Sequence, residues 1–311
     1  MQQALETLQW ILLIAAIGAV AALISQFRLV RRRQKQLWRR TERLEAAALE
    51  LRRSVATAAA TQDLASQPGP DRPRFHFTAQ DNEDVFLYEL FQGKRSGRYI
   101  EVGAHDGQHL SVTLPFEALG WTGVLIEPVR KNFEACRQAR PASHVVHAAL
   151  GPAGSKGSVT FHEVVGEDHS GVMSYLKTNV HHEQDLKAKD ARVHSVEVPY
   201  TTMTEVLAEA PQPEQPYDFA VIDVEGGEVG LFQGFDLARF APAVLIVEDK
   251  ADPQSSPVRP IIESAGYERA TAIGINDVYV IRSQPELLRR APTRLRNSLT
   301  PRPPSRCALS T

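Results

Sequence analysis

The sequence predicts an α/β fold in which helices cover both faces of an open, doubly wound and mostly parallel sheet. Apolar runs of strand length alternate with helical segments from about residue 98 onwards. The first run, 98–102, breaks into a glycine-containing turn, and the second, 123–126, ends in Glu127. A strand, a tight turn before a helix and an acid at the tip of the next strand are typical of doubly wound folds that bind a nucleoside. We therefore expect a nucleoside-containing ligand.

The first 30 residues predict a membrane anchor. Residues 7–27 carry no charged side chain, and a helix of that length spans about 31 Å, close to the thickness of the hydrocarbon core. Seven of residues 28–40 are basic, which favours a single span, a cytoplasmic body and contacts between the basic flank and lipid headgroups. A cleaved signal peptide is the alternative, but it requires positive charge before the apolar run, where this chain has only Glu6.

Residues 31–64 have the composition of a juxtamembrane helix. Apolar residues recur there every seven positions, at Val30, Leu37, Leu44 and Leu51. This spacing is typical of a coiled coil, although Gln34 and Thr41 weaken the apolar seam. Two interpretations stay open: a homodimer formed through residues 30–60, and a solvated single helix.

The globular body is expected over residues 75–282, after a linker rich in proline and glycine at 65–74. A polar insertion at 165–192 resembles the segments that form substrate loops. Residues 283–311 are rich in proline and arginine, which predicts a disordered basic tail. The expected strands are 98–102, 123–126, 144–147, 157–164, 193–198, 217–222, 243–247, 267–272 and 277–282, and the expected helices are 84–91, 111–119, 129–139, 202–210 and 261–265.

The net charge of -2 hides an uneven distribution. Residues 1–74 carry 12 Lys and Arg against 6 Asp and Glu, and residues 282–311 carry 7 against 1. The body between them is therefore strongly acidic, which excludes a nucleic-acid substrate because that requires a basic surface. Two cysteines, Cys136 and Cys307, form neither a disulfide framework nor a metal-binding spacing, which indicates a reducing compartment.

Acidic residues end four of the expected strands, at Glu101, Glu127, Asp223 and Glu248. The carboxyl ends of parallel strands meet at one edge of a sheet, where ligands of this fold class bind. Like charges at that edge repel one another. A ligand that is rich in hydroxyl and amino groups, or that carries a positive sulfonium, relieves this repulsion.

Three motifs together resemble the FkbM-type methyltransferases: 100–107 (IEVGAHDG), 123–128 (GVLIEP) and 222–228 (IDVEGGE). The resemblance covers about residues 98–282. It implies the seven-stranded class I methyltransferase fold and transfer of a methyl group from S-adenosylmethionine, typically to a hydroxyl of a sugar or polyketide-like acceptor. Two departures concern the acceptor pocket: Met203-Thr204 stands where a Leu-Asp pair is usual, and His105 where a small amide is common.

By this resemblance and these positions, the expected cofactor-binding residues are Glu101, Gly103, Asp106, Gly107, Glu127, Ala148 and Ala149. Among them, Glu127 is expected to bind the ribose and the two alanines to flank the adenine. Asp223 is the leading candidate for the catalytic base, followed by Glu225. If the enzyme uses a divalent metal, its ligands are expected among Asp223, Glu225 and Glu248. Glu228 is a weaker candidate, since acids are also favoured in the first turn of a helix.

Two other functions compete with methyl transfer. A non-catalytic, membrane-tethered module could use the same fold to bind a nucleoside ligand or a partner protein, but the acids at 223 and 225 argue against a decayed site. An NAD(P)-dependent dehydrogenase or epimerase would require the G-x-G-x-x-G and Tyr-x-x-x-Lys motifs, which this sequence lacks.

Overall fold

The computed structural model describes residues 2–65, 75–165, 174–176, 192–249 and 255–291. It separates into two compact units, residues 1–54 and 55–311. The first unit consists of most of one long helix, α1 (Gln2–Ala65). Most side chains of the expected anchor, residues 1–30, lie outside the described part. In the described part of the chain, no helix has both the length and the apolar character required to cross a membrane.

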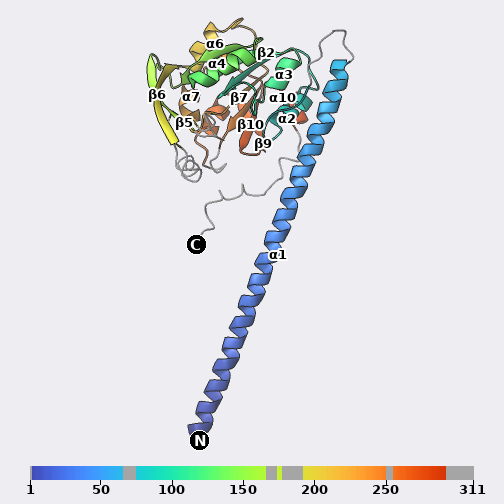
Figure 1. The fold of residues 1–311 in the computed structure, drawn as a ribbon, viewed down its shortest axis with the longest axis vertical. Helices are drawn as coiled ribbons and strands as arrows, with labels where there is room; N and C mark the ends of the chain where they lie inside the picture. The colour runs from blue at the N-terminus through green and yellow to red at the C-terminus, as the bar shows by residue number, and fades with distance from the viewer. Residues whose placement is uncertain (1, 66–74, 166–173, 177–191, 250–254, 292–311) are drawn as a thin grey trace. The chain divides into compact units, whose positions relative to one another are not determined.

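The second unit contains a seven-stranded sheet with the strand order β3-β2-β1-β7-β8-β10-β9 (Figure 1). Neighbouring strands from β3 to β8 are parallel, and β10 is antiparallel to both β8 and β9. The central strands are buried on both faces, as expected for continuous apolar runs. This confirms the predicted mostly parallel sheet. Its strands are β1 (Arg98–Val102), β2 (Thr122–Glu127), β3 (His144–His147), β7 (Phe219–Ile222), β8 (Val244–Glu248), β9 (Tyr267–Ile273) and β10 (Asn276–Ile281).

Helices pack against both faces of this sheet and form two separate apolar cores. Alternate residues of one strand enter different cores, so that Tyr99 belongs to the first and Ile100 to the second. The first core includes Ala56 and Ala60, near the C-terminal end of α1. The helices of the first core are α2 (Glu83–Leu90), α3 (Leu114–Ala118), α4 (Arg130–Ala139) and α10 (Pro285–Arg290), and those of the second are α6 (Met203–Glu209), α7 (Glu228–Gln233), α8 (Leu237–Phe240) and α9 (Arg259–Ser264).

A second, three-stranded sheet has the order β4-β6-β5 and lies at one edge of the body (Figure 1). It consists of β4 (Ala149–Leu150), β5 (Ser158–Val165) and β6 (Arg192–Thr201). The expected strands 157–164 and 193–198 are therefore confirmed as β5 and β6. Between them, 166–173 and 177–191 lie outside the described residues, and with them most of the polar insertion and its histidines, His169, His181 and His182.

The structure differs from the sequence prediction at four helices, of which α7 and α8 were not expected. The helix expected at 111–119 is shortened to α3, because the residues before it are held in a non-helical loop by side-chain hydrogen bonds to Glu101. The expected tail, 283–311, contains α10, because Leu287 and Ala291 are apolar enough to be buried in the first core. Residues 292–311 lie outside the described part.

Candidate active site

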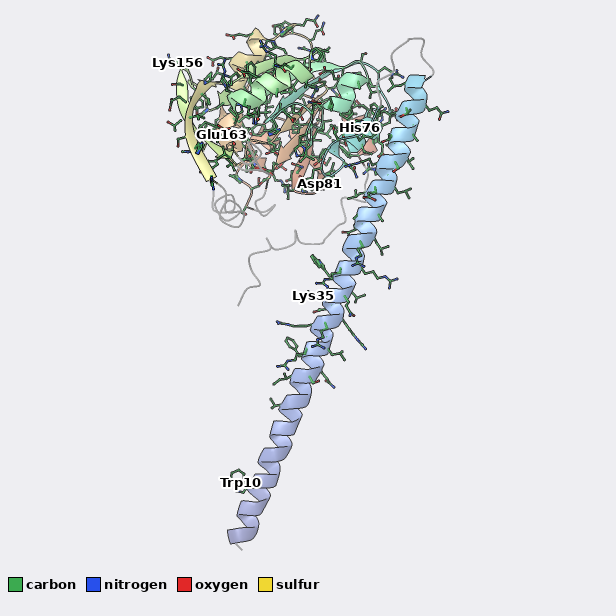
Figure 2. The ribbon with its side chains drawn as sticks, in the orientation of Figure 1. Trp10, Lys35, His76, Asp81, Lys156 and Glu163 are labelled. Atoms are coloured by element: carbon green, nitrogen blue, oxygen red, sulfur yellow. The ribbon has the colours of Figure 1, made fainter. Side chains whose placement is uncertain are left out.

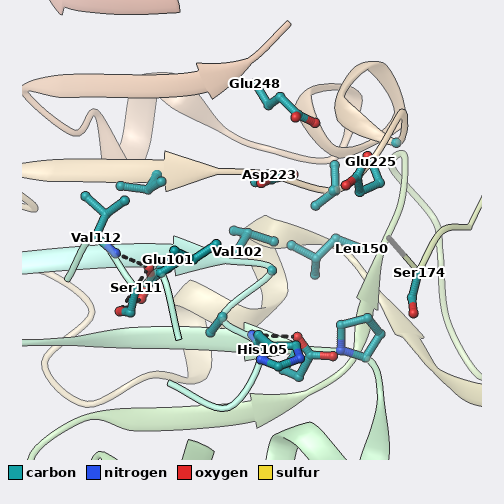
Figure 3. Close-up of a pocket in the computed structure, with 18 of the residues that line it drawn as sticks. Glu101, Val102, His105, Ser111, Val112, Leu150, Ser174, Asp223, Glu225 and Glu248 are labelled. Carbon is teal, nitrogen blue, oxygen red and sulfur yellow. Dashed lines mark hydrogen bonds between the residues drawn. The ribbon is translucent and has the colours of Figure 1, made fainter. Parts of the chain in front are cut away.

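A cavity of about 400 Å³ opens at the carboxyl ends of β1, β2, β7 and β8. This size is typical of sites that enclose small molecules. The acids at the four strand tips, Glu101, Glu127, Asp223 and Glu248, all line it. Figure 3 shows Asp223, Glu225 and Glu248 on one side of the cavity and His105 across from them. The edge of the sheet thus brings together the acids that the sequence singles out.

The turn after β1 forms the floor of the cavity and has an unusual backbone. Gly103 and Gly107 have φ values of 82° and 73°, and His105 has a φ of 49°. Glycine is favoured in this left-handed region because it has no Cβ. Gly103 lines the cavity, and a Cβ at this position would overlap the backbone carbonyl oxygen of Asp223. The turn after β1 is therefore packed directly against the tip of β7.

Asp106 stabilises this turn and does not itself line the cavity. Its Oδ1 accepts hydrogen bonds from the backbone N–H groups of Gln108 (2.9 Å) and His109 (2.7 Å). Partial burial opposes ionisation of Asp106, but these hydrogen bonds outweigh it and lower the pKa of the carboxyl. Of the expected cofactor-binding residues, Asp106 and Gly107 are the two that do not line the cavity. They act on it through the shape of the turn.

Glu127 is buried at the tip of β2, and each of its oxygens accepts a backbone hydrogen bond. Oε1 accepts from the N–H of Val129 and Oε2 from the N–H of His105, both at 2.8 Å. Burial raises the pKa of Glu127 to about 7, although these hydrogen bonds and the nearby Asn132 and His105 favour the ionised form. The carboxyl therefore titrates near neutral pH in the ligand-free protein.

Glu101 forms hydrogen bonds that hold the loop before α3 in place. Its carboxylate accepts hydrogen bonds from the backbone N–H of Val112 (2.9 Å) and from the hydroxyls of Ser111 (2.9 Å) and Thr113 (2.6 Å), two of which are drawn in Figure 3. The fully buried guanidinium of Arg140 lies 3.8 Å from it. Glu101 lines the cavity, as expected, but most of its hydrogen-bonding capacity is used within the protein.

Arg140 connects this loop to the turn after β1. Its Nε donates to Glu117 at 2.8 Å, and its remaining nitrogens donate to the side chains of Tyr99, Thr113 and Ser111 and to the carbonyl oxygen of Gly107. A buried charge requires this number of partners, because an unpaired one would be strongly destabilising. Arg140 thus supports both segments that carry the floor of the cavity.

Asp223, Glu225 and Glu248 form a cluster of carboxylates at the tips of β7 and β8. One oxygen from each can be chosen so that all three lie within 4.8 Å of one another. Asp223 is exposed, Glu225 is half-buried and Glu248 is buried. Three hard oxygen ligands at this spacing fit the coordination sphere of Mg²⁺ or Ca²⁺. The three metal-ligating candidates from the sequence are therefore adjacent.

Glu228 belongs to the first turn of α7 and does not line the cavity. Its carboxylate accepts a hydrogen bond from the backbone N–H of Gly226 at 3.0 Å. Burial raises the pKa of Glu228 to about 7, and the nearby Glu248 and Glu225 add to this. Its position favours a structural role at the helix N-terminus over a catalytic one.

The family model of the methyltransferase FkbM domain matches residues 101–269, which is more than half of the chain. The chain belongs to the FkbM methyltransferase family. This assignment makes it an S-adenosylmethionine-dependent methyltransferase and confirms the resemblance seen in the three motifs. The matched residues include the four acids at the strand tips.

Solved structures of other methyltransferases show low overall similarity to this FkbM enzyme. A TehB-like SAM-dependent methyltransferase from Corynebacterium glutamicum is 9% identical, with 63% of this chain and 88% of that chain covered and a TM-score of 0.32. A precorrin-6y C5,15-methyltransferase from Geobacter metallireducens is 11% identical, with 66% and 93% covered and a TM-score of 0.35. No curated protein matches the chain.

The FkbM enzyme also lines its cavity with residues that the sequence did not single out. Asp81 and Glu83 reach it from the segment before β1, and Asn276 from the first position of β10. The Asn276 amide donates to Glu83 at 2.7 Å, and burial raises the pKa of Glu83 to about 7. Phe161 and Leu176 add an apolar wall. No motif marks these positions, because they become neighbours only through the fold.

Proposed function

We propose that this enzyme transfers the methyl group of S-adenosylmethionine to a hydroxyl oxygen of a sugar, a glycan or a related small acceptor. The observation that carries the proposal is the position of Asp223. Its carboxylate is exposed at the tip of the central strand β7 and lines the cavity next to Gly103. It is therefore accessible to an acceptor that enters the cavity beside the cofactor.

The residues around the turn after β1 are suited to hold the cofactor. Glu127 would accept hydrogen bonds from the ribose hydroxyls, as the acid at this strand tip does in doubly wound folds. Gly103 allows the methionine part of the cofactor to approach the backbone, and the buried Ala148 and Ala149 leave room for the adenine. Glu101 and Asp106 would act indirectly, by fixing the loops that contact the ligand.

Methyl transfer is an in-line displacement, so that positioning provides much of the catalysis. The cofactor supplies a methyl carbon bound to a positive sulfur, and the electron pair of the broken C–S bond remains on that sulfur. The acceptor oxygen forms the new C–O bond and loses its proton. Asp223 would accept that proton, and Glu225 is the second candidate.

The same carboxylates would hold a divalent cation if the reaction uses one. Such a cation would bind the acceptor hydroxyl and lower its pKa. Asp223, Glu225 and Glu248 would be its protein ligands, and their mutual proximity fits this role. A metal titration of the cofactor-loaded enzyme would distinguish this arrangement from general-base catalysis by Asp223 alone.

We further propose that the enzyme acts at the cytoplasmic face of a membrane. The uncharged run 7–27 and the basic block after it support a single anchoring span. In intact cells, protease added outside should then leave residues 75–282 uncut. Cleavage of that region before the cells are lysed would reverse the proposed orientation.

The proposed reaction is tested with S-adenosylmethionine that carries an isotopic label in its methyl group. The full-length enzyme is incubated with the labelled cofactor and with a mixture of sugars, glycans and membrane extracts. The label should appear in an ether that resists mild alkaline hydrolysis. Label found only on nitrogen or in a base-labile ester would contradict O-methylation of a hydroxyl. Cofactor binding without transfer to any of these acceptors would favour the non-catalytic module.

A further inference from the structure

The helix α1 carries an exposed, largely apolar stripe between residues 27 and 55. Its members alternate three and four residues apart, the spacing of the a and d positions of a heptad repeat. Leu37, Leu44 and Leu51 at d are 64%, 63% and 66% exposed, and Val55 at a is 62% exposed. The a positions are Phe27, Gln34, Thr41, Ala48 and Val55, and the d positions are Val30, Leu37, Leu44 and Leu51.

Charged residues beside this stripe argue against its lying on a globular core or on a lipid surface. A helix face that does so is at least about 100° wide and includes the positions that flank a and d. Here the flanking positions include the charged Arg33 and Arg40 at g and Glu45 at e, beside the apolar Trp38 at e and Ala47 at g. Figure 2 shows the side chains of this part of α1, such as Lys35, pointing away from the helix axis. An exposed heptad seam with charged residues beside it matches a partner helix with the same repeat.

The polar a positions are compatible with burial in such a seam. The hydroxyl of Thr41 donates to the carbonyl oxygen of Leu37 in its own helix at 3.2 Å, so that only its methyl group would face a partner. Gln34 has an amide that can donate and accept, and it can pair with a second Gln34 when both lie in the same layer. A polar residue at one a position is a known determinant of register in two-stranded coiled coils. The residues that weaken the stripe therefore add specificity to it.

The charges beside the seam favour a parallel arrangement of two copies. In a parallel pair, the g residue of one helix lies next to the e residue five positions later in its partner. Arg40 would then meet Glu45 of the second copy, and Arg33 would meet the ring of Trp38, a favourable cation–π pair. In an antiparallel pair, g positions face g positions, which would bring arginines together.

We propose that residues 27–55 form a parallel, in-register, two-stranded coiled coil with a second copy of this chain. Leucine at d with β-branched residues at some a positions favours two strands over three. Ala56 and Ala60 are buried in the core of the body, whereas the adjacent Val55 is exposed. The seam therefore ends where the helix joins the globular domain. This dimer does not depend on the methyl acceptor or on membrane attachment.

Cysteine cross-linking in the full-length chain tests the register. The background variant is Cys307→Ser, in which the only native cysteine is the buried Cys136. Leu44→Cys places a thiol at a d position, and Ala46→Cys places one at the outward f position. Under mild oxidation, Leu44→Cys should give a disulfide-linked dimer at least several-fold more efficiently than Ala46→Cys. Equal cross-linking at both positions, or none at position 44, would overturn the proposal.

A charge exchange tests the interaction without a cysteine. Glu45→Arg places two arginines next to two others in the parallel dimer, and the dimer dissociation constant should rise roughly tenfold. The double variant Arg40→Glu with Glu45→Arg restores opposite charges and should return the constant to near its original value. Arg39→Glu, at an f position, is the control.

The dimer dissociation constants come from analytical ultracentrifugation of the full-length protein in detergent. A monomeric wild-type protein, or failure of the double variant to recover, would contradict the pairing, provided that cofactor binding shows all variants to be folded.

Discussion

The carboxylate of Glu127 accepts a hydrogen bond from the backbone N–H of His105 at 2.8 Å. This bond joins the tip of β2 to the middle of the turn after β1, at a residue whose φ of 49° is unusual for a side chain other than glycine. The same carboxyl lines the cavity and is the one assigned to the ribose. Glu127 therefore both shapes the cofactor site and belongs to it, and its removal should affect binding more than stability.

We expect Glu127→Ala to weaken binding of S-adenosylmethionine by one to a few orders of magnitude. The variant loses hydrogen bonds from the ribose to a charged group, each of which contributes roughly 1.5–3 kcal/mol, partly offset by water. Isothermal titration calorimetry measures the change. Glu134→Ala, which removes an exposed acid from the neighbouring α4, should leave the affinity unchanged. An unaltered affinity of Glu127→Ala would refute the ribose assignment.

Cofactor affinity should increase as the pH rises from about 6 to 8. Burial raises the pKa of Glu127 from 4.5 to about 7 in the ligand-free protein, so that below pH 7 this carboxyl is mostly protonated. Ribose hydroxyls donate more favourably to the ionised form, and binding below pH 7 therefore releases a proton. The affinity should rise by up to about tenfold per pH unit below pH 7.

Titration calorimetry in two buffers of different ionisation enthalpy measures that proton release. Glu83 has a similarly raised pKa and lines the same cavity, so Glu127→Gln and Glu83→Gln are compared. The dependence of cofactor affinity on pH should become flatter in Glu127→Gln than in Glu83→Gln. A wild-type slope retained in Glu127→Gln would assign the proton to another group.

The sequence was sufficient to predict the sheet and the acids at its tips. Short continuous apolar runs bounded by turn residues, such as 219–222, are typical of buried strands. Parallel strands end at a common edge, so the positions of Glu101, Glu127 and Asp223 followed from their places at the ends of those runs. The cap of α6 was also predictable: Thr202 and Glu205 form the reciprocal hydrogen bonds of a capping box.

Arg140 and Asn276 could not be predicted in the same way. An arginine at the end of a helix before a proline normally lies at the surface, and its burial depends on partners that the fold collects from residues 99–117. Asn276 contacts Glu83, which is 193 positions away in the sequence. Asp106 was expected to bind the cofactor, but its carboxylate holds the turn after β1 through local hydrogen bonds. The sequence has no pattern that distinguishes a residue that binds the ligand from one that stabilises the turn.

Arg140→Met should lower the free energy of unfolding by about 3–5 kcal/mol, because it leaves the buried Glu101 and the partly buried Glu117 without their cation. Urea denaturation followed by circular dichroism measures the change. Arg137→Met, which removes an exposed arginine from the last turn of the same helix, is the matched control and should change stability by less than about 0.5 kcal/mol. Equal effects of the two substitutions would exclude a supporting role for the buried ion pairs.

Asp223→Asn should lower turnover by about 10²–10⁴ while cofactor affinity changes little. The substitution keeps the shape of the side chain and removes its charge, and the expected loss is that of a general base. Single-turnover measurements with labelled cofactor separate the chemical step from binding. Asp236→Asn is the control, because Asp236 is an exposed helix cap that does not line the cavity and asparagine caps helices equally well.

Substitution of Glu248, together with a chelator, distinguishes general-base catalysis by Asp223 alone from catalysis with a bound metal ion. If Asp223 acts alone, Glu248→Gln should retain most of the activity and a chelator should have no effect. If the three carboxylates bind a cation, Glu248→Gln should reduce turnover as Asp223→Asn does, and activity lost to a chelator should return when Mg²⁺ or Mn²⁺ is added. Loss of cofactor binding in Asp223→Asn, with no separate effect on the chemical step, would instead make Asp223 a cofactor ligand. The proton acceptor would then have to be sought at Glu225, the other acid that lies in the cavity between β7 and α7.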